Sequence, residues 1–209
     1  MESLFNITSL ATEAGGVLGA ILMAAGIYIL SAAKKKIEAK AFFSVENVIN
    51  RNLRLQALLY ECRGVFDCDR VKLFQFHNGD YFLSGESVQK LSITHFALKR
   101  GVSSPVSNGN PYLNIPVSVM LHCLDRIKEA ENIMFSSVED LPDEFAMKDS
   151  LRATGCHTVA MTAVRNQYGK MYGVLFLTWL SPIDKPKKLD ELKHFAHDLG
   201  SEIAYQNRK

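Results

Sequence analysis

The first 33 residues of this 209-residue chain contain no lysine or arginine, and residues 14–33 contain no charged side chain of either sign. A cleaved secretory signal places positive charge before a short apolar stretch. Here the charged side chains before the apolar run are Glu2 and Glu13, and a lysine cluster follows it within residues 34–40. This order is the reverse of the one that a cleaved signal requires, which excludes that interpretation.

Cysteine is scarce, and the motifs of common catalytic and metal centres are missing. The four cysteines, Cys62, Cys68, Cys123 and Cys156, form no CxxC pair, and their spacing is not that of a disulfide scaffold. The sequence contains no glycine-rich phosphate loop, no HExxH and no GxSxG. We therefore expect buried thiols, no metal site and no cofactor.

Two pairs of side chains that could suggest catalysis or metal binding have simpler explanations. Cys156 and His157 are neighbours in a predicted strand, so their side chains point to opposite faces and do not form a nucleophile–base pair. His194 and His197 share one face of a predicted helix, but no third ligand lies near them in the sequence. We expect a protein that is not an enzyme, with a thiol-dependent reductase as the rival hypothesis.

The uncharged run AGGVLGAILMAAGIYILSAA, residues 14–33, predicts one transmembrane helix. A helix of this length reaches roughly 30 Å, the thickness of the hydrocarbon core of a bilayer. The lysines that follow favour a cytoplasmic C-terminal side under the positive-inside rule. We predict a single-pass signal anchor, in the inner membrane if the source is a bacterium or a phage, and a buried core helix is the alternative.

Small residues on this predicted helix favour contact with a second copy of the chain. Gly15, Gly19 and Gly26 fall near one helical face. Small side chains so placed let two membrane helices approach closely. These glycines are therefore candidate interface residues of a homo-oligomer, although glycine is common in membrane helices in any case.

The rest of the chain has the composition of an ordinary folded domain. Of the whole chain, 47% is hydrophobic and 22% is charged, which excludes disorder and low complexity. All 24 lysines and arginines and 20 of the 22 acidic residues lie after residue 33, so that part carries a net charge of +4. This charge is too small to indicate nucleic-acid binding. It suits a domain held close to an anionic membrane leaflet.

Hydrophobic periodicity predicts a mixed helix and strand order after residue 33. Helices are expected directly after the apolar run, in the middle of the domain and at the C-terminus. An antiparallel strand hairpin is expected around Asn166–Gly169. The predicted helices are 34–63, 117–129, 143–154 with Asp143 as its cap and Gly155 beyond its end, and 187–206; the predicted strands are 70–79, 88–98, 132–135, 156–164 and 171–180. In strand 88–98, Leu91, Ile93 and Ala97 are expected on one face. The segment 101–116 is expected to be a loop.

This order resembles that of the GAF domain over about residues 40–206, and the most specific segment is residues 158–177. It reads TVAMTAVRNQYGKMYGVLFL, an apolar strand, a polar turn and a second strand with Gly-Val-Leu. The resemblance implies an α+β fold: an antiparallel sheet with N- and C-terminal helices on one face and a pocket on the other. PAS and related sensory folds share part of this order.

The stretch Phe76–Gly79, with Gly85, Ser87 and Lys90, resembles a variant of the GAF domain in phage-encoded proteins. The nucleotide-binding motif of phosphodiesterase-type GAF domains is not recognisable in this sequence.

Polar residues near the end of the first predicted strand form the candidate ligand site. Short polar groups and flexible backbone at a strand end commonly hold a small polar or anionic ligand. Lys90 is a candidate contact for phosphate or carboxylate. The candidates are His77, Asn78, Gly79, Asp80, Gly85, Ser87, Lys90 and His95. The alternative is an Asn-Gly turn that needs no ligand.

We divide the chain into a short N-terminal segment (1–13), a transmembrane helix (14–33), a helical stalk (34–63) and a GAF-like domain (64–209). No output domain is recognised. The first hypothesis is a membrane-anchored ligand-binding or regulatory module, a sensor in which ligand binding alters the packing of the stalk. The second is a protein-interaction scaffold with an unidentified partner, such as a phage protein acting at the host envelope or a virion component. The third is the thiol reductase.

Overall fold

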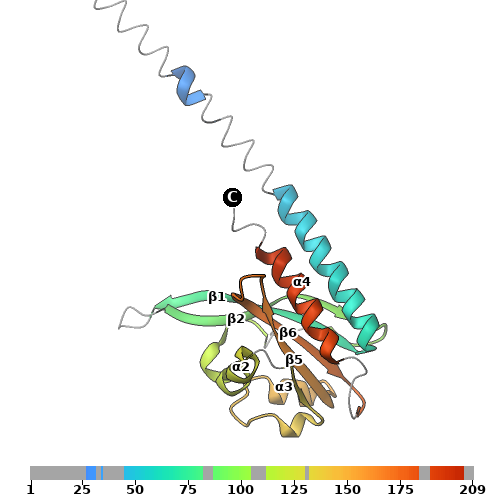
Figure 1. Ribbon diagram of the computed structural model, residues 1–209. Coiled ribbons are helices and arrows are strands. Elements are labelled where there is room, and N and C mark those ends of the chain that lie inside the picture. The colour runs from blue at the N-terminus through green and yellow to red at the C-terminus, as the bar shows by residue number, and fades with distance from the viewer. Residues whose placement is uncertain are drawn as a thin grey trace, which may run out of the picture. The chain divides into compact units, whose positions relative to one another are not determined.

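The computed structural model describes residues 27–31, 34, 45–81, 87–104, 112–129, 132–183 and 189–204 (Figure 1). The chain forms two units, Met1–Asn50 and Arg51–Lys209. In the first unit, residues 27–31 are helical, and the four large side chains from Ile27 to Leu30 are 65–74% exposed. A continuous helix covers residues 45–66, so the C-terminal half of the predicted stalk is confirmed as helical.

The predicted transmembrane helix lies mostly outside the described residues. Only residues 27–31 of the span 14–33 are described, and Gly15, Gly19 and Gly26 are not among them. Within the described part of the chain, no helix combines the length and the apolar character needed to cross a bilayer. The span and its glycine interface therefore stay predictions.

In the second unit, the described residues form a six-stranded antiparallel sheet in the order β3-β2-β1-β6-β5-β4. The strands are β1 (Arg70–Tyr81), β2 (Ser87–Leu98), β3 (Ile115–Pro116), β4 (Ile133–Phe135), β5 (Thr158–Arg165) and β6 (Met171–Trp179). The predicted hairpin is confirmed. Asn166 Oδ1 closes its turn by accepting bonds from the backbone N–H groups of Tyr168 and Lys170, and Gly169 takes the positive φ of +78°.

The two faces of the sheet are covered by different helices (Figure 1). The two long helices, residues 51–66 and α4 (Leu192–Ala204), lie on one face, which we call the helix-covered face. They pack apolar side chains such as Leu55, Leu59 and Leu199 against Val71 and Leu73 of β1. On the opposite face, α2 (Leu121–Lys128) and α3 (Lys148–Ala153) close a second core around Phe74, Phe145 and Phe176. The sheet therefore separates two hydrophobic cores, as the predicted α+β architecture requires.

Strand β2 does not keep one face throughout its length. Its pairing with β1 shifts between Leu73↔His95 and Phe74↔Ile93, which leaves Thr94 as an extra residue. Such a bulge exchanges the faces of the residues on its two sides. Leu91 and Ile93 accordingly lie in the core of the opposite face, and Ala97 lies in the core of the helix-covered face. The prediction that these three residues share one face is wrong.

Three predicted helix boundaries and one loop also differ from the structure. Helix α3 begins at Lys148 rather than at 143, because no side chain caps it and Asp143 instead accepts a 2.8 Å bond from Lys148 Nζ. Helices α2 and α4 are each preceded by a 3-10 turn, Val117–Met120 and Leu189–Glu191. The predicted loop 101–116 ends in strand β3, which pairs with β2. Gly155 does follow α3, with φ +69°.

Strands β1 and β2 extend beyond the part of the sheet that β6 covers (Figure 1). Pairing of β1 with β6 ends at Gln75↔Gly173, whereas pairing with β2 continues to Tyr81↔Ser87. We call residues 76–81 and 87–92 the β1–β2 arm. The prediction that Asn78-Gly79 ends the strand is wrong, because Asn78 pairs with Gln89 and accepts a 3.1 Å bond from its side-chain amide.

Candidate functional site

The predicted polar site lies on the β1–β2 arm, and the structure brings part of it together. His77 is opposite Lys90 in the strand pair, as antiparallel pairing of the two segments would place it. Its Nε2 atom lies 2.9 Å from Ser92 Oγ, and that hydroxyl also accepts a 2.9 Å bond from the backbone N–H of Asn114. His77 and Lys90 are half-buried and Asn78 is exposed. The arm thus holds a small hydrogen-bonded polar cluster.

Of the other predicted site residues, His95 lies apart from this cluster, and several lie outside the described part of the chain. Gly79 is half-buried between His77 and the tip, Gly85 lies outside the described residues, and so do the side chains of Asp80 and Ser87. His95 pairs with Leu73, on the other side of the bulge, and its Nδ1 atom lies 3.1 Å from Thr94 Oγ1. Burial lowers the pKa of His95, and the positive charge of Arg51 lowers it further. This histidine is therefore neutral at pH 7.

A second group of polar side chains lies on the opposite face of the sheet, and the sequence analysis missed it. Arg70 and Lys72 of β1 are only 2% and 1% exposed, and Thr178 of β6 is fully buried. The ammonium group of Lys72 lies over the aromatic rings of Tyr112 and Phe176. We call these five residues the cation corner. Two basic side chains inside a hydrophobic core are unusual, because an unpaired buried charge is costly.

The sequence did contain a signal for the cation corner. In Arg70-Val71-Lys72-Leu73-Phe74, the two basic residues alternate with apolar ones inside a run of strand formers. Alternation alone suggests an exposed face for the basic residues. The strand is instead central and covered on both faces, so both basic side chains are buried.

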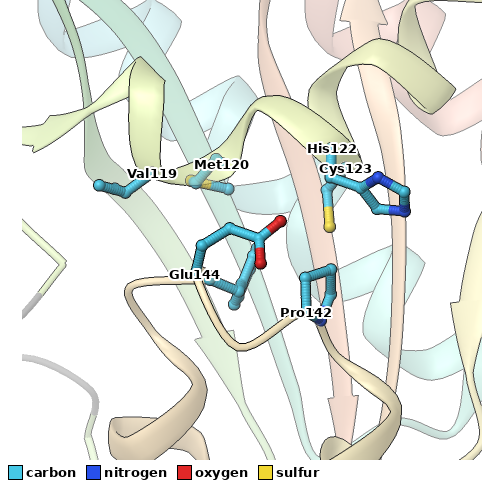
Figure 2. Close-up of a pocket in the computed structure, with 7 residues that line it drawn as sticks. Val119, Met120, His122, Cys123, Pro142 and Glu144 are labelled. Atoms are coloured by element: carbon cyan, nitrogen blue, oxygen red, sulfur yellow. The ribbon is translucent and has the colours of Figure 1, made fainter.

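A shallow surface pocket lies between α2 and the segment before α3 (Figure 2). His122, Cys123 and Glu144 line it together with Val119, Met120, Pro142 and Phe145. A cysteine, a histidine and a glutamate in one pocket could suggest a thiol nucleophile. Burial instead raises the pKa of Cys123 to about 11, although the charge of Arg126 opposes the rise, and the charge of Glu144 adds to it. The thiol therefore stays protonated and is a poor nucleophile at neutral pH.

The remaining cysteines have the same character. All four are buried and unpaired. Burial raises the pKa of Cys68 to about 12 and that of Cys156 to about 11, and it raises the pKa of Cys62 as well. Near Cys156, His157 Nδ1 lies 3.4 Å from Thr158 Oγ1. Nothing among these contacts favours the thiol-reductase hypothesis.

The comparisons with known proteins identify the fold. No family model matches the chain, and no curated protein matches it significantly. Among solved structures, the blue-light-absorbing form of the PixJ GAF domain of Thermosynechococcus elongatus aligns with 12% identity and a TM-score of 0.58, covering 78% of this chain and 91% of that one. The photoproduct state of GAF3 from Slr1393 of Synechocystis sp. PCC6803 aligns with 18% identity and a TM-score of 0.56, covering 76% and 95%.

A third structure, the GAF domain region of a Geobacter sulfurreducens PCA protein, aligns with 10% identity and a TM-score of 0.51, covering 76% of this chain and 96% of that one. The chain has a GAF-like fold. At these identities the similarity extends to the fold of the GAF-like domain and not to its ligand. The resemblance of the arm to phage-encoded variants stays a prediction.

Proposed function

We propose that the protein is a membrane-anchored regulatory module whose GAF-like domain binds a small ligand. GAF-like folds are common in ligand-binding and sensory proteins, and the neighbours here are GAF domains. The observation that carries the proposal is the cation corner. It contains two buried polar atoms that have no hydrogen-bond partner among the described residues, Arg70 Nη1 and Thr178 Oγ1, on the sheet face opposite the two long helices. Buried polar groups in native proteins nearly always have a hydrogen-bond partner, so a bound ligand is a reasonable partner for these two atoms.

Strand β1 connects the proposed ligand site to the helix that continues the stalk. Arg70 and Lys72 point to the ligand side, and Val71 and Leu73, which alternate with them, pack on the helix of residues 51–66. Because side chains alternate along a strand, a displacement of β1 moves both sets together. Ligand binding on one face would thus change helix packing on the other.

The membrane part of the proposal rests on the sequence of residues 14–33. Twenty consecutive uncharged residues match a bilayer span, and the lysines after it favour a cytoplasmic domain at an inner membrane. The apolar side chains from Ile27 to Leu30 are exposed, as those of a lipid-facing helix would be.

We expect the double substitution Leu22→Arg and Met23→Arg to release the protein from membranes. Two arginines near the centre of a span cost about 5–7 kcal/mol on insertion scales. The measurement is the fraction of full-length chain that pellets after an alkaline carbonate wash. The matched control, Leu121→Arg with Tyr168→Arg, adds the same charges at exposed positions of the domain and should still pellet. Equal release of both variants, or of the unmodified chain, would contradict the anchor.

We expect native mass spectrometry of the detergent-purified full chain to show a bound small molecule. Gentle activation should remove a fixed mass increment and leave the bare polypeptide. A spectrum of bare polypeptide alone, in every charge state, would argue against a ligand-binding module. The same spectrum gives the number of copies in the particle.

A protein-interaction scaffold is the second candidate, and one observation favours it. On the helix of residues 45–66, Leu53 and Tyr60 are 63% and 54% exposed, and Val45 and Ile49 are also exposed. Apolar side chains repeated at helical spacing on an exposed face suit contact with a partner or a second copy. A stable oligomer without a bound small molecule in the native spectrum would favour this alternative.

A further inference from the structure

We propose that Arg70, Lys72 and Thr178 form a binding site for a small oxyanion, a ligand whose recognised group is a carboxylate or a phosphate. The proposal rests on the ligand-binding function proposed above and specifies its chemistry. Its basis is a set of buried hydrogen-bond donors on one patch of the sheet, and no carboxylate among the described residues forms an ion pair with Arg70 or Lys72.

The three side chains are neighbours because of the strand register. Arg70 is directly opposite Thr178 in the β1–β6 pair, and Lys72 is opposite Phe176. Arg70 and Lys72 are two residues apart, so they point to the same face of β1. Side chains at directly opposite positions have Cβ atoms about 5 Å apart, close enough for two of them to contact one small ligand.

The guanidinium of Arg70 is held in place but is not fully used. Nη2 donates to Thr154 O at 3.2 Å and to Ser103 Oγ at 3.3 Å, and Nε donates to Ser103 O at 3.4 Å. All three acceptors are neutral, so the positive charge has no counterion among them. Nη1 is buried, and no described residue accepts a hydrogen bond from it. The side chain is therefore held in place, and the two N–H donors of Nη1 are available to a ligand.

Lys72 is held by aromatic rings rather than by acceptors. Its Nζ atom lies 4.4 Å from the ring centre of Tyr112 and 5.4 Å from that of Phe176. Cation–π contacts of this kind position an ammonium group without neutralising it. Thr178 Oγ1 is buried and has no hydrogen-bond partner among the described residues, so it can supply a hydroxyl donor.

Two other basic side chains of the described domain, Lys148 and Arg152, do have carboxylate partners. Lys148 pairs with Asp143 at 2.8 Å, and Arg152 pairs with Glu139 and Asp149 at 2.6 and 2.7 Å. The structure gives Arg70 and Lys72 no such pair among the described residues, although these two are the more deeply buried. This buried patch has two basic side chains and no negative charge paired with them among the described residues. A bound oxyanion would supply that charge.

The site should bind more tightly below pH 7 than above it. Burial lowers the pKa of Lys72 to about 7, and the charge of Arg70 acts in the same direction. The other titratable groups that face Lys72 are Tyr112 and Cys156, and burial raises the pKa of both, so they stay neutral in this range. Because only charged Lys72 donates strongly to an anion, the affinity for acetate, whose own charge is constant in this range, should fall about twenty-fold between pH 6.5 and 8.5.

The test is a thermal-shift titration of the full chain in detergent with sodium phosphate and, separately, sodium acetate, against sodium chloride at matched ionic strength. The variants are Lys72→Met, Thr178→Val and the control Lys170→Met, which removes an exposed lysine of the β5–β6 turn. We expect at least one oxyanion to raise the melting temperature beyond chloride. We expect the dissociation constant to be at least about ten-fold weaker in Lys72→Met and about five-fold weaker in Thr178→Val.

The outcomes separate this inference from the proposed function. A shift in the unmodified chain and in Lys170→Met that is lost in the two site variants supports the site, and the better of the two anions identifies the headgroup. Thr178→Val keeps the side-chain volume and carries the test if Lys72→Met does not fold. Equal shifts in every variant, or no shift beyond chloride, overturn the oxyanion site. If native mass spectrometry still showed a bound small molecule, the proposed ligand-binding function would hold, and its ligand would bind elsewhere or by other chemistry.

Discussion

Replacing Lys72 with methionine is expected to stabilise the ligand-free protein at pH 7. Most substitutions of a fully buried side chain destabilise a protein. Here the buried ammonium group has no counterion, and methionine fills a similar volume without the cost of desolvating a charge. The pKa of Lys72 is lowered from its usual 10.5 to about 7, a difference that corresponds to roughly 3–5 kcal/mol of destabilisation by the charged form.

The gain should depend on pH in a defined direction. The unfolded chain holds its proton on Lys72 up to about pH 10, whereas the folded chain releases it near pH 7. Between these values the unfolded state binds more protons, so the contribution of Lys72 to stability becomes more favourable as pH rises. The advantage of Lys72→Met should be largest at and below pH 7 and should disappear toward pH 10. Urea unfolding of both proteins at pH 6, 8 and 10 measures it.

Lys148→Met is the matched control for this prediction. The side chain of Lys148 is only 12% exposed, but it is paired with Asp143 and donates a 2.7 Å bond to Leu141 O. Its removal deletes satisfied interactions and should lower the stability. If Lys72→Met were as destabilising as Lys148→Met and showed no change with pH, the ammonium of Lys72 would have a partner that balances its charge.

The sequence predicted the elements whose patterns are local. The β5–β6 hairpin and α4 follow from apolar runs, a glycine-bearing turn and helical spacing, all of which lie within about twenty residues of one another. The bulge at Thr94 could not be read in this way, since it depends on how β2 pairs with β1. Because of the bulge, Ala97 lies in a different core from Leu91 and Ile93.

The candidate site shows the same limit. The polar residues from His77 to Lys90 are close together in the sequence, so a local pattern can point to them, and β1 and β2 bring His77 next to Ser92. The cation corner joins Arg70 and Thr178, which are 108 residues apart and meet only through the β1–β6 register. Their burial depends on a strand order that no local pattern specifies.

Replacing Gly200 with alanine is expected to destabilise the domain severely. Gly200 lies in α4 where the helix crosses β5, and a Cβ atom there would overlap the carbonyl oxygen of Arg165. The obstacle is backbone, so it cannot be relieved by turning a side chain. The helix would have to move away from a core that includes Leu199 and Ile203. Overpacking of this kind costs about 3 kcal/mol or more.

Gly64→Ala is the control, because Gly64 also lies in a helix but a Cβ atom there meets nothing within 4 Å. Alanine is the better helix former by about 0.5–1 kcal/mol, so this variant should be slightly more stable. Thermal unfolding of the two variants should therefore move the melting temperature in opposite directions, by roughly 6–12 °C down for Gly200→Ala and about 1–4 °C up for Gly64→Ala. A Gly200→Ala protein that unfolds at the original temperature would show that α4 does not rest on β5 at Arg165, and that the helix-covered face is packed less closely than the glycine implies.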